Sequence, residues 1–229
     1  MSAIATFSAF PKLPEPLGLF GGTFDPVHFG HLRLAEEAIA QLALGGVRWI
    51  PAGQPAHREE PGAAGERRLA MVRLAIAGNP AFFVDAAEVE AAAPSYTVPT
   101  LQRLRAELGG DLPLVLLLGA DAFAGLEGWL RWRELFALAH IAVSHRPGFP
   151  VATEALPPAL RAEFAARHQS DVAALRAAPA GNIVSFAMTQ LAISATQIRH
   201  LRATGRSARY LLPDAVLDYI QTYSLYRNS

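Results

Sequence analysis

The stretch that decides the fold of this chain is Leu17-Gly-Leu-Phe-Gly-Gly-Thr-Phe-Asp-Pro-Val-His-Phe-Gly-His31. Leu17 to Phe20 predict a buried strand, and Gly21-Gly22 lets the backbone turn or be approached closely. From Gly30 onward apolar residues recur at helical spacing, which predicts a helix that ends at Gly45-Gly46. A strand, a glycine turn and a helix start form an anion site, because unpaired backbone N–H groups and the positive dipole end face one point.

Two histidines stand at the start of this predicted helix. His28 and His31 are three residues apart, so both can direct ring N–H donors at the same anion. The two commoner phosphate loops, Gly-x-x-x-x-Gly-Lys-Ser/Thr and Gly-x-Gly-x-x-Gly after the strand, are absent. A glycine-rich turn with two surface histidines is the simpler interpretation of these residues on their own.

The bulk composition limits the class of protein. The chain has 229 residues, 52% of them hydrophobic and 17% charged, which suits one α/β domain over residues 17–229 after a flexible leader over 1–16. Its formal net charge of +0 gives no general attraction for nucleic acid or a membrane surface. Cysteine is absent, and no signal peptide or membrane span is apparent. We therefore expect a cytoplasmic protein; the sequence leaves self-association open.

Strand and helix patterns alternate along the rest of the chain. Further strands are expected at 47–51, 82–85, 114–118, 141–144 and 182–187. Helices are expected at 66–77, 98–108, 158–167, 195–204 and 214–222, with helical segments around Trp129 and Trp132. This alternation predicts a Rossmann-like, doubly wound, mainly parallel sheet with helices on both faces and a small C-terminal helical portion.

A second phosphate-binding element is predicted near the C-terminus. Ser194 is a good helix N-cap, and Gln197 three residues later completes a capping box. Thr196 lies in the first turn, and Arg199, one turn on, can grip phosphate oxygens. Two helix starts that face one crevice would hold a polyphosphate from both sides.

These motifs carry a resemblance to a known family. The pattern Gly21-Gly-Thr-Phe-Asp-Pro-x-His-x-Gly-His31 resembles the nucleotidyltransferases with the His-x-Gly-His element, most closely the bacterial nicotinate mononucleotide adenylyltransferases. Ile193-Ser-Ala-Thr-Gln-Ile-Arg199 is similar to the family motif that holds the triphosphate of ATP. The resemblance covers about residues 17–227. It departs at Leu201, where many members have a second arginine, so extra phosphate contacts from this helix are not expected.

The resemblance implies roles for further residues. Ser95-Tyr-Thr97 is similar to a family element whose threonine lies against the nicotinate, and Gly119-x-Asp121 followed by Trp129 is similar to one whose tryptophan stacks on the pyridine ring. The implied catalytic residues are His28, His31 and Arg199. The implied ATP-binding residues are Gly21, Gly22, Thr23, Phe24, Gly119, Asp121, Ser194 and Thr196. The implied nicotinate-nucleotide-binding residues are Thr97, Trp129, His57 and Arg58.

The resemblance also implies the reaction. The expected substrates are ATP, accompanied by Mg²⁺, and nicotinate mononucleotide; the products are deamido-NAD and pyrophosphate, in a step of NAD biosynthesis. No metal-ligating residue is assigned. The alternatives are a preference for nicotinamide mononucleotide, transfer to another phosphate within the superfamily, or a non-catalytic regulator that senses pyridine nucleotides.

Overall fold

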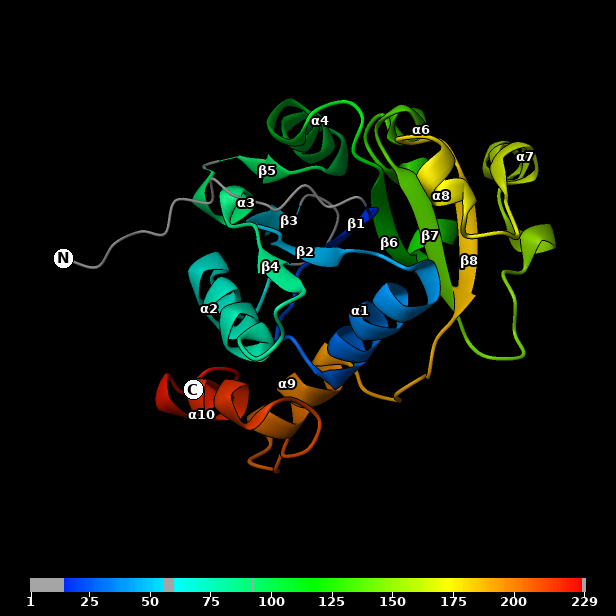
Figure 1. Ribbon diagram of the computed structural model, residues 1–229. Coiled ribbons are helices and arrows are strands. Elements are labelled where there is room, and N and C mark those ends of the chain that lie inside the picture. The colour runs from blue at the N-terminus through cyan, green and yellow to red at the C-terminus, as the bar shows by residue number, and fades with distance from the viewer. Residues whose placement is uncertain (1–14, 56–59, 92, 228–229) are drawn as a thin grey trace.

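A parallel sheet of six strands forms the centre of the molecule in a computed structural model that describes residues 15–55, 60–91 and 93–227 (Figure 1). The strand order is β4-β2-β1-β6-β7-β8. The strands are β1 (Leu17–Gly22), β2 (Gly46–Pro51), β4 (Phe82–Val84), β6 (Leu114–Gly119), β7 (His140–His145) and β8 (Ile183–Ala187). Two short strands, β3 (Gln54–Pro55) and β5 (Pro94–Ser95), pair in parallel beside it. The expected doubly wound parallel sheet is confirmed.

Helices connect these strands in the expected alternation. The longer ones are α1 (Phe29–Leu42), α2 (Gly65–Ile76), α4 (Thr97–Leu108), α7 (Pro158–Arg167), α9 (Ala195–Ala203) and α10 (Asp214–Thr222). The shorter ones are α3 (Ala87–Glu90), α5 (Ala120–Ala124), α6 (Leu135–Leu138), α8 (Ala174–Ala177) and the 3-10 turns Leu126–Gly128, Trp132–Glu134 and Thr153–Ala155. The sequence predicted the ends of the longer helices to within about one residue, except that α1 ends at Leu42, three residues before the expected stop at Gly45-Gly46. Of the short ones it indicated only the helical segments around Trp129 and Trp132, because three to five residues carry too little periodicity.

Side chains alternate between the two faces of the sheet and build two cores. In β6, Val115 and Leu117 point into one core, while Leu114, Leu116 and Leu118 point into the other. Figure 1 shows α1, α2, α9 and α10 on the first face and α4, α6 and α7 on the second. Both faces of the sheet are therefore covered, which explains why the strands read as nearly continuous apolar runs.

The strand order indicates where the expected ligand-binding crevice lies. Successive strands after β1 proceed outward on one side through β2 and β4, and then on the other side through β6, β7 and β8. The direction of winding thus reverses between β1 and β6, and ligands of such sheets bind beyond the carboxyl ends of the strands at this point. Among the described residues, no helix combines the length and the apolar character needed to cross a membrane.

Some predictions fall outside the described residues. Of the expected leader over residues 1–16, residues 1–14 lie there, as do His57 and Arg58 of the proposed substrate loop.

Candidate active site

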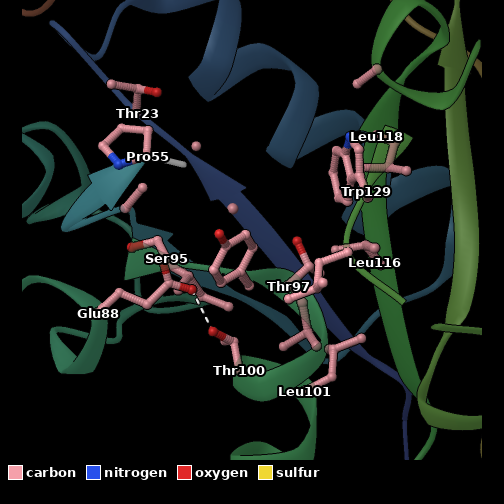
Figure 2. Close-up of a pocket in the computed structure, with 18 of the residues that line it drawn as sticks. Thr23, Pro55, Glu88, Ser95, Thr97, Thr100, Leu101, Leu116, Leu118 and Trp129 are labelled. Carbon is pink, nitrogen blue, oxygen red and sulfur yellow. Dashed lines mark hydrogen bonds between the residues drawn. The ribbon is translucent and has the colours of Figure 1, made fainter. Parts of the chain in front are cut away.

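A cavity of about 350 Å³ opens where the winding of the sheet reverses, over β1 and β6. The predicted site residues that line it are Gly21, Gly22, Thr23, Asp121, Thr97 and Trp129. Figure 2 shows Trp129 beside Leu118 on one wall, Glu88 and Ser95 on the opposite wall, and Thr97 between them. A Cβ built on Gly21 would meet no atom within 4 Å, so glycine is not needed here to avoid a clash and leaves this part of the cavity open.

The paired histidines stand at the start of α1, directly after the β1 loop. The imidazoles of His28 and His31 are stacked, with ring centroids 3.7 Å apart. The backbone N–H of His28 donates to Nδ1 of His31 over 3.2 Å. Because Nδ1 of His31 accepts this bond, a neutral His31 ring carries its proton on Nε2. The ring therefore has a fixed tautomer and an N–H donor directed away from the helix backbone.

The ring of Phe24 packs against the ring of His31. Its side chain is buried, and its ring meets the His31 ring edge-on with centroids 5.1 Å apart. The Phe24 ring also packs edge-on against Phe20, in the core. Phe24 was predicted to bind ATP, but only its backbone could contact a ligand, because its side chain packs beneath the histidine.

His28 is more deeply buried than its partner. Its Nδ1 lies buried without a hydrogen-bond partner among the described residues, which leaves Nε2 as the nitrogen that can meet a ligand. Burial lowers the pKa of His28 to about 4, because the charged imidazolium loses its hydration. His28 is therefore neutral near pH 7.

The burial of His28 predicts a loss of stability in mild acid. Its folded pKa of about 4 lies below the ordinary value of 6.5, so the unfolded chain binds the proton first as the pH falls. The contribution of neutral His28 to the free energy of unfolding is fully present above about pH 6.5. It falls by about 3 kcal/mol as the pH drops from 6.5 to 4. Urea unfolding at pH 7 and pH 4.5 measures this fall. His28→Asn should reduce the fall by about 2 kcal/mol or more; an equal fall in both proteins would contradict the prediction.

The second helix start lies next to the first. A Cβ built on Gly30 of α1 would stand 3.8 Å from the carbonyl oxygen of Ile193, the residue before the N-cap of α9. Ser194 caps α9 by accepting the N–H of Gln197 over 3.1 Å, as predicted. The N-terminal ends of α1 and α9 therefore lie close together, although about 165 residues separate them in the chain.

Arg199 links the two helix starts directly. Its Nη2 donates to the Thr196 hydroxyl over 3.3 Å, within α9. Its Nη1 donates to the main-chain oxygen of Asp25 over 2.7 Å, three residues before His28. The guanidinium thus lies on the same side of the molecule as the two imidazoles, in the arrangement that the sequence predicted.

Two buried charges that sequence reasoning did not assign hold this region together. The Asp25 carboxylate accepts the N–H groups of Gly62 and Ala63 over 2.7 and 3.1 Å. Arg68 of α2 is 1% exposed and donates to the carbonyl oxygens of Thr23 and Ala52, in the loops after β1 and β2, over 2.8 and 2.6 Å. Burial lowers the pKa of Arg68, and the negative charge of Asp25 opposes that shift. The pair fixes the backbone that precedes His28.

The wall of the cavity opposite Trp129 also contains a partly buried acid. Glu88 of α3 accepts a hydrogen bond from Thr100, and burial is the largest of the effects that raise the pKa of Glu88. Gly53 must be glycine, since a Cβ there would stand 1.9 Å from the carbonyl oxygen of Glu88. Within 15–55, 60–91 and 93–227, no group of three or more His, Asp or Glu side chains gathers as a metal site.

Comparisons with known proteins agree with this geometry. The family model described as cytidylyltransferase-like matches residues 19–201. A relative from Dechloromonas aromatica (strain RCB), named "Probable nicotinate-nucleotide adenylyltransferase", is 70% identical over 217 residues, 95% of this chain and 100% of its own. A relative of the same name from Pseudomonas putida (strain W619) is 52% identical over 92% of this chain and 94% of its own.

Solved structures show the same fold. A Plasmodium falciparum nicotinic acid mononucleotide adenylyltransferase complexed with NaAD superposes with a TM-score of 0.67 at 16% identity, covering 93% of this chain and 97% of that one. The two helix starts over the switch point and the near-complete coverage of these relatives lead to one assignment: the chain belongs to the cytidylyltransferase-like family, among the bacterial nicotinate-nucleotide adenylyltransferases.

Proposed function

We propose that the protein transfers the adenylyl group of ATP to nicotinate mononucleotide, giving deamido-NAD and pyrophosphate. The observation that carries the proposal is the hydrogen bond from Arg199 to Asp25, which brings the starts of α1 and α9 together beside the cavity. Two helix starts and one arginine suit a triphosphate, and the adjoining cavity suits a nucleotide base.

The proposed chemistry needs no covalent enzyme intermediate. The phosphate of nicotinate mononucleotide is already anionic at neutral pH and attacks the α-phosphate of ATP in line, while pyrophosphate leaves with the electrons of the broken P–O bond. His28 and His31 donate to the α-phosphate oxygens, where negative charge increases in the transition state. Ser194, Thr196 and Arg199 hold the β- and γ-phosphates. Mg²⁺ arrives bound to ATP and offsets the remaining charge.

The backbone of the β1 loop and the residues after β6 complete the ATP site in this proposal. Gly21, Gly22, Thr23 and Phe24 supply backbone donors, and Gly119 and Asp121 lie at the end of β6 across the switch point. Their place agrees with the general position of nucleotides in such sheets.

Thr97 and Trp129 are the proposed contacts of the pyridine ring, and His57 and Arg58 those of the substrate phosphate. Thr97 is the first residue of α4, so its N–H and that of Val98 are neutral donors at a positive helix end, which favour the nicotinate carboxylate over an amide. The described cavity residues include two acids, Glu88 and Asp121, but no Arg, Lys or His. Selection of the carboxylate therefore depends on backbone N–H groups in this proposal.

A coupled pyrophosphate-release assay tests the proposed function. The protein is supplied with Mg²⁺ and ATP together with nicotinate mononucleotide or, separately, nicotinamide mononucleotide. Faster release with the nicotinate form supports the proposal, and faster release with the nicotinamide form reverses the substrate preference. Binding of either mononucleotide without any release of pyrophosphate supports the alternative, a non-catalytic regulator that senses pyridine nucleotides.

Trp129→Ala should weaken binding of nicotinate mononucleotide. A cationic pyridinium over an indole gains about 0.5–2 kcal/mol, so the KM for this substrate should rise by about 10-fold. Initial rates at saturating ATP measure the change, and Trp129→Phe, which keeps an aromatic face, should show a smaller increase. An unchanged KM in Trp129→Ala would remove the stacking role.

A further inference from the structure

The Asp25 carboxylate has a further hydrogen-bond donor, contributed by a residue beyond α10. The Tyr226 hydroxyl donates to Oδ1 of Asp25 over 2.7 Å. Oδ2 of the same carboxylate lies 3.6 Å from Nη1 of Arg199. Asp25 is 5% exposed, so the number of donors around it decides how strongly its charge acts on Arg199. A residue far along the chain thus reaches the predicted phosphate site through one carboxylate.

The position of Tyr226 is closely constrained. Burial and the charge of Asp25 raise the pKa of the Tyr226 hydroxyl, which therefore stays protonated and remains a donor. Its backbone has a φ of 60°, in the left-handed region that is unfavourable for a residue with a side chain. Packing and the bond to Asp25 together maintain this conformation.

Gly62 separates Tyr226 from Arg199. A Cβ built there would stand 3.3 Å from the Tyr226 ring and 3.3 Å from Cδ of Arg199. The tyrosine ring and the stem of the arginine therefore both lie close to Gly62, one on each side of the space that a methyl group there would fill. Tyr226 constrains Arg199 both by contact through Gly62 and by charge through Asp25.

We propose that Tyr226 is a positioning residue for adenylyl transfer: its hydroxyl holds the Asp25 carboxylate, which in turn sets the position in which Arg199 receives the ATP phosphates. This inference rests on the proposed function. Without the hydroxyl, the N–H of Ala63 is the one donor to Oδ1 left among the described residues, and the charged guanidinium of Arg199 lies near enough to compensate. Asp25 then draws Arg199 toward itself and competes with the phosphates.

Tyr226→Phe tests this role because it removes one oxygen and keeps the ring. We expect kcat/KM for ATP to fall about 10-fold, while the KM for nicotinate mononucleotide stays within twofold of the wild-type value. Tyr219→Phe, in α10, is the matched control: its hydroxyl accepts a hydrogen bond from Arg67 of α2, and within the described residues no hydrogen bond connects it to Asp25. This control should keep kcat/KM for ATP within twofold of wild type.

A double-mutant cycle distinguishes positioning from general loosening. If Tyr226 acts through Arg199, Tyr226→Phe should lower kcat/KM for ATP by less than threefold in an Arg199→Lys background. Equal fold losses in both backgrounds would overturn the inference. A loss shared equally between the two substrates would also overturn it, because general loosening has no preference for ATP.

Two further measurements distinguish a failure of the proposed function from a failure of the inference about Tyr226. Gly62→Ala places a methyl group between Tyr226 and Arg199 and should also raise the KM for ATP, so the inference can be tested even if Tyr226→Phe does not fold. If the wild-type protein releases no pyrophosphate with either mononucleotide, the proposed function fails. If the wild type turns over and neither Tyr226→Phe nor Gly62→Ala changes kcat/KM for ATP by more than twofold, only the inference about Tyr226 fails.

Discussion

Replacing His31 by Ala is expected to lower turnover by at least about 100-fold, the usual cost of removing one preorganised donor from developing charge. The His31 ring is held by the N–H of His28, by stacking on the His28 ring and by the edge of Phe24. These contacts fix the ring before substrate arrives, so its donor needs no reorganisation during the reaction. Such a donor is worth most in the transition state, and the loss should appear in kcat rather than in KM.

Steady-state pyrophosphate release with saturating ATP and nicotinate mononucleotide measures this loss. The matched control is His168→Ala, an exposed histidine after α7 that stacks on Phe164 and takes no part in the candidate site. It should retain wild-type turnover. If kcat of His31→Ala were within threefold of the wild-type value, His31 would have no role in charge stabilisation.

Replacing Arg68 by Met is expected to reduce the free energy of unfolding by about 3–5 kcal/mol. The methionine fills similar space but leaves several carbonyl oxygens without their donor: those of Thr23, Ala52, Gly53 and Ala63. Unsatisfied buried acceptors are costly, and the buried Asp25 also loses its favourable charge interaction with Arg68.

Urea unfolding at pH 7 measures the change. Arg73→Met, an exposed position on the same helix, is the matched control and should cost less than about 1 kcal/mol, because only a favourable charge near a helix end is lost. Similar losses of unfolding free energy in the two variants would mean that the buried hydrogen bonds of Arg68 contribute no more to stability than an exposed arginine does.

The sequence already contained a signal for Arg68 that a closer analysis of α2 could have used. Arg68, Val72 and Ile76 are spaced four residues apart and share one helical face, and the latter two are apolar. An arginine on a buried stripe must find acceptors, whereas its neighbour Arg67 points out and lies 3.8 Å from the centre of the Tyr223 ring. Periodicity distinguishes the two arginines, but it cannot name the carbonyl groups that Arg68 binds.

Asp25 was visible within the quoted motif and was still not assigned a role. Its partners are Gly62, Ala63, Arg199 and Tyr226, from three segments far apart in the chain. No spacing rule connects residues that are more than 35 positions apart, so the convergence on this carboxylate appears only when the segments pack together.

The sequence by itself determined the order of strands and helices, the parallel sheet and the two helix starts with their histidines, serine and arginine. These features follow from neighbouring residues: hydrophobic periodicity, glycine at turns and capping residues act over a few positions. Only the tertiary structure decided that Phe24 supports His31, that Glu88 and Trp129 lie on opposite walls of one cavity, and that Arg68 and Tyr226 fix the loop before α1. Those relations depend on packing between distant segments. A charge that becomes buried there needs a hydrogen-bond or ionic partner, and the local sequence pattern does not identify that partner.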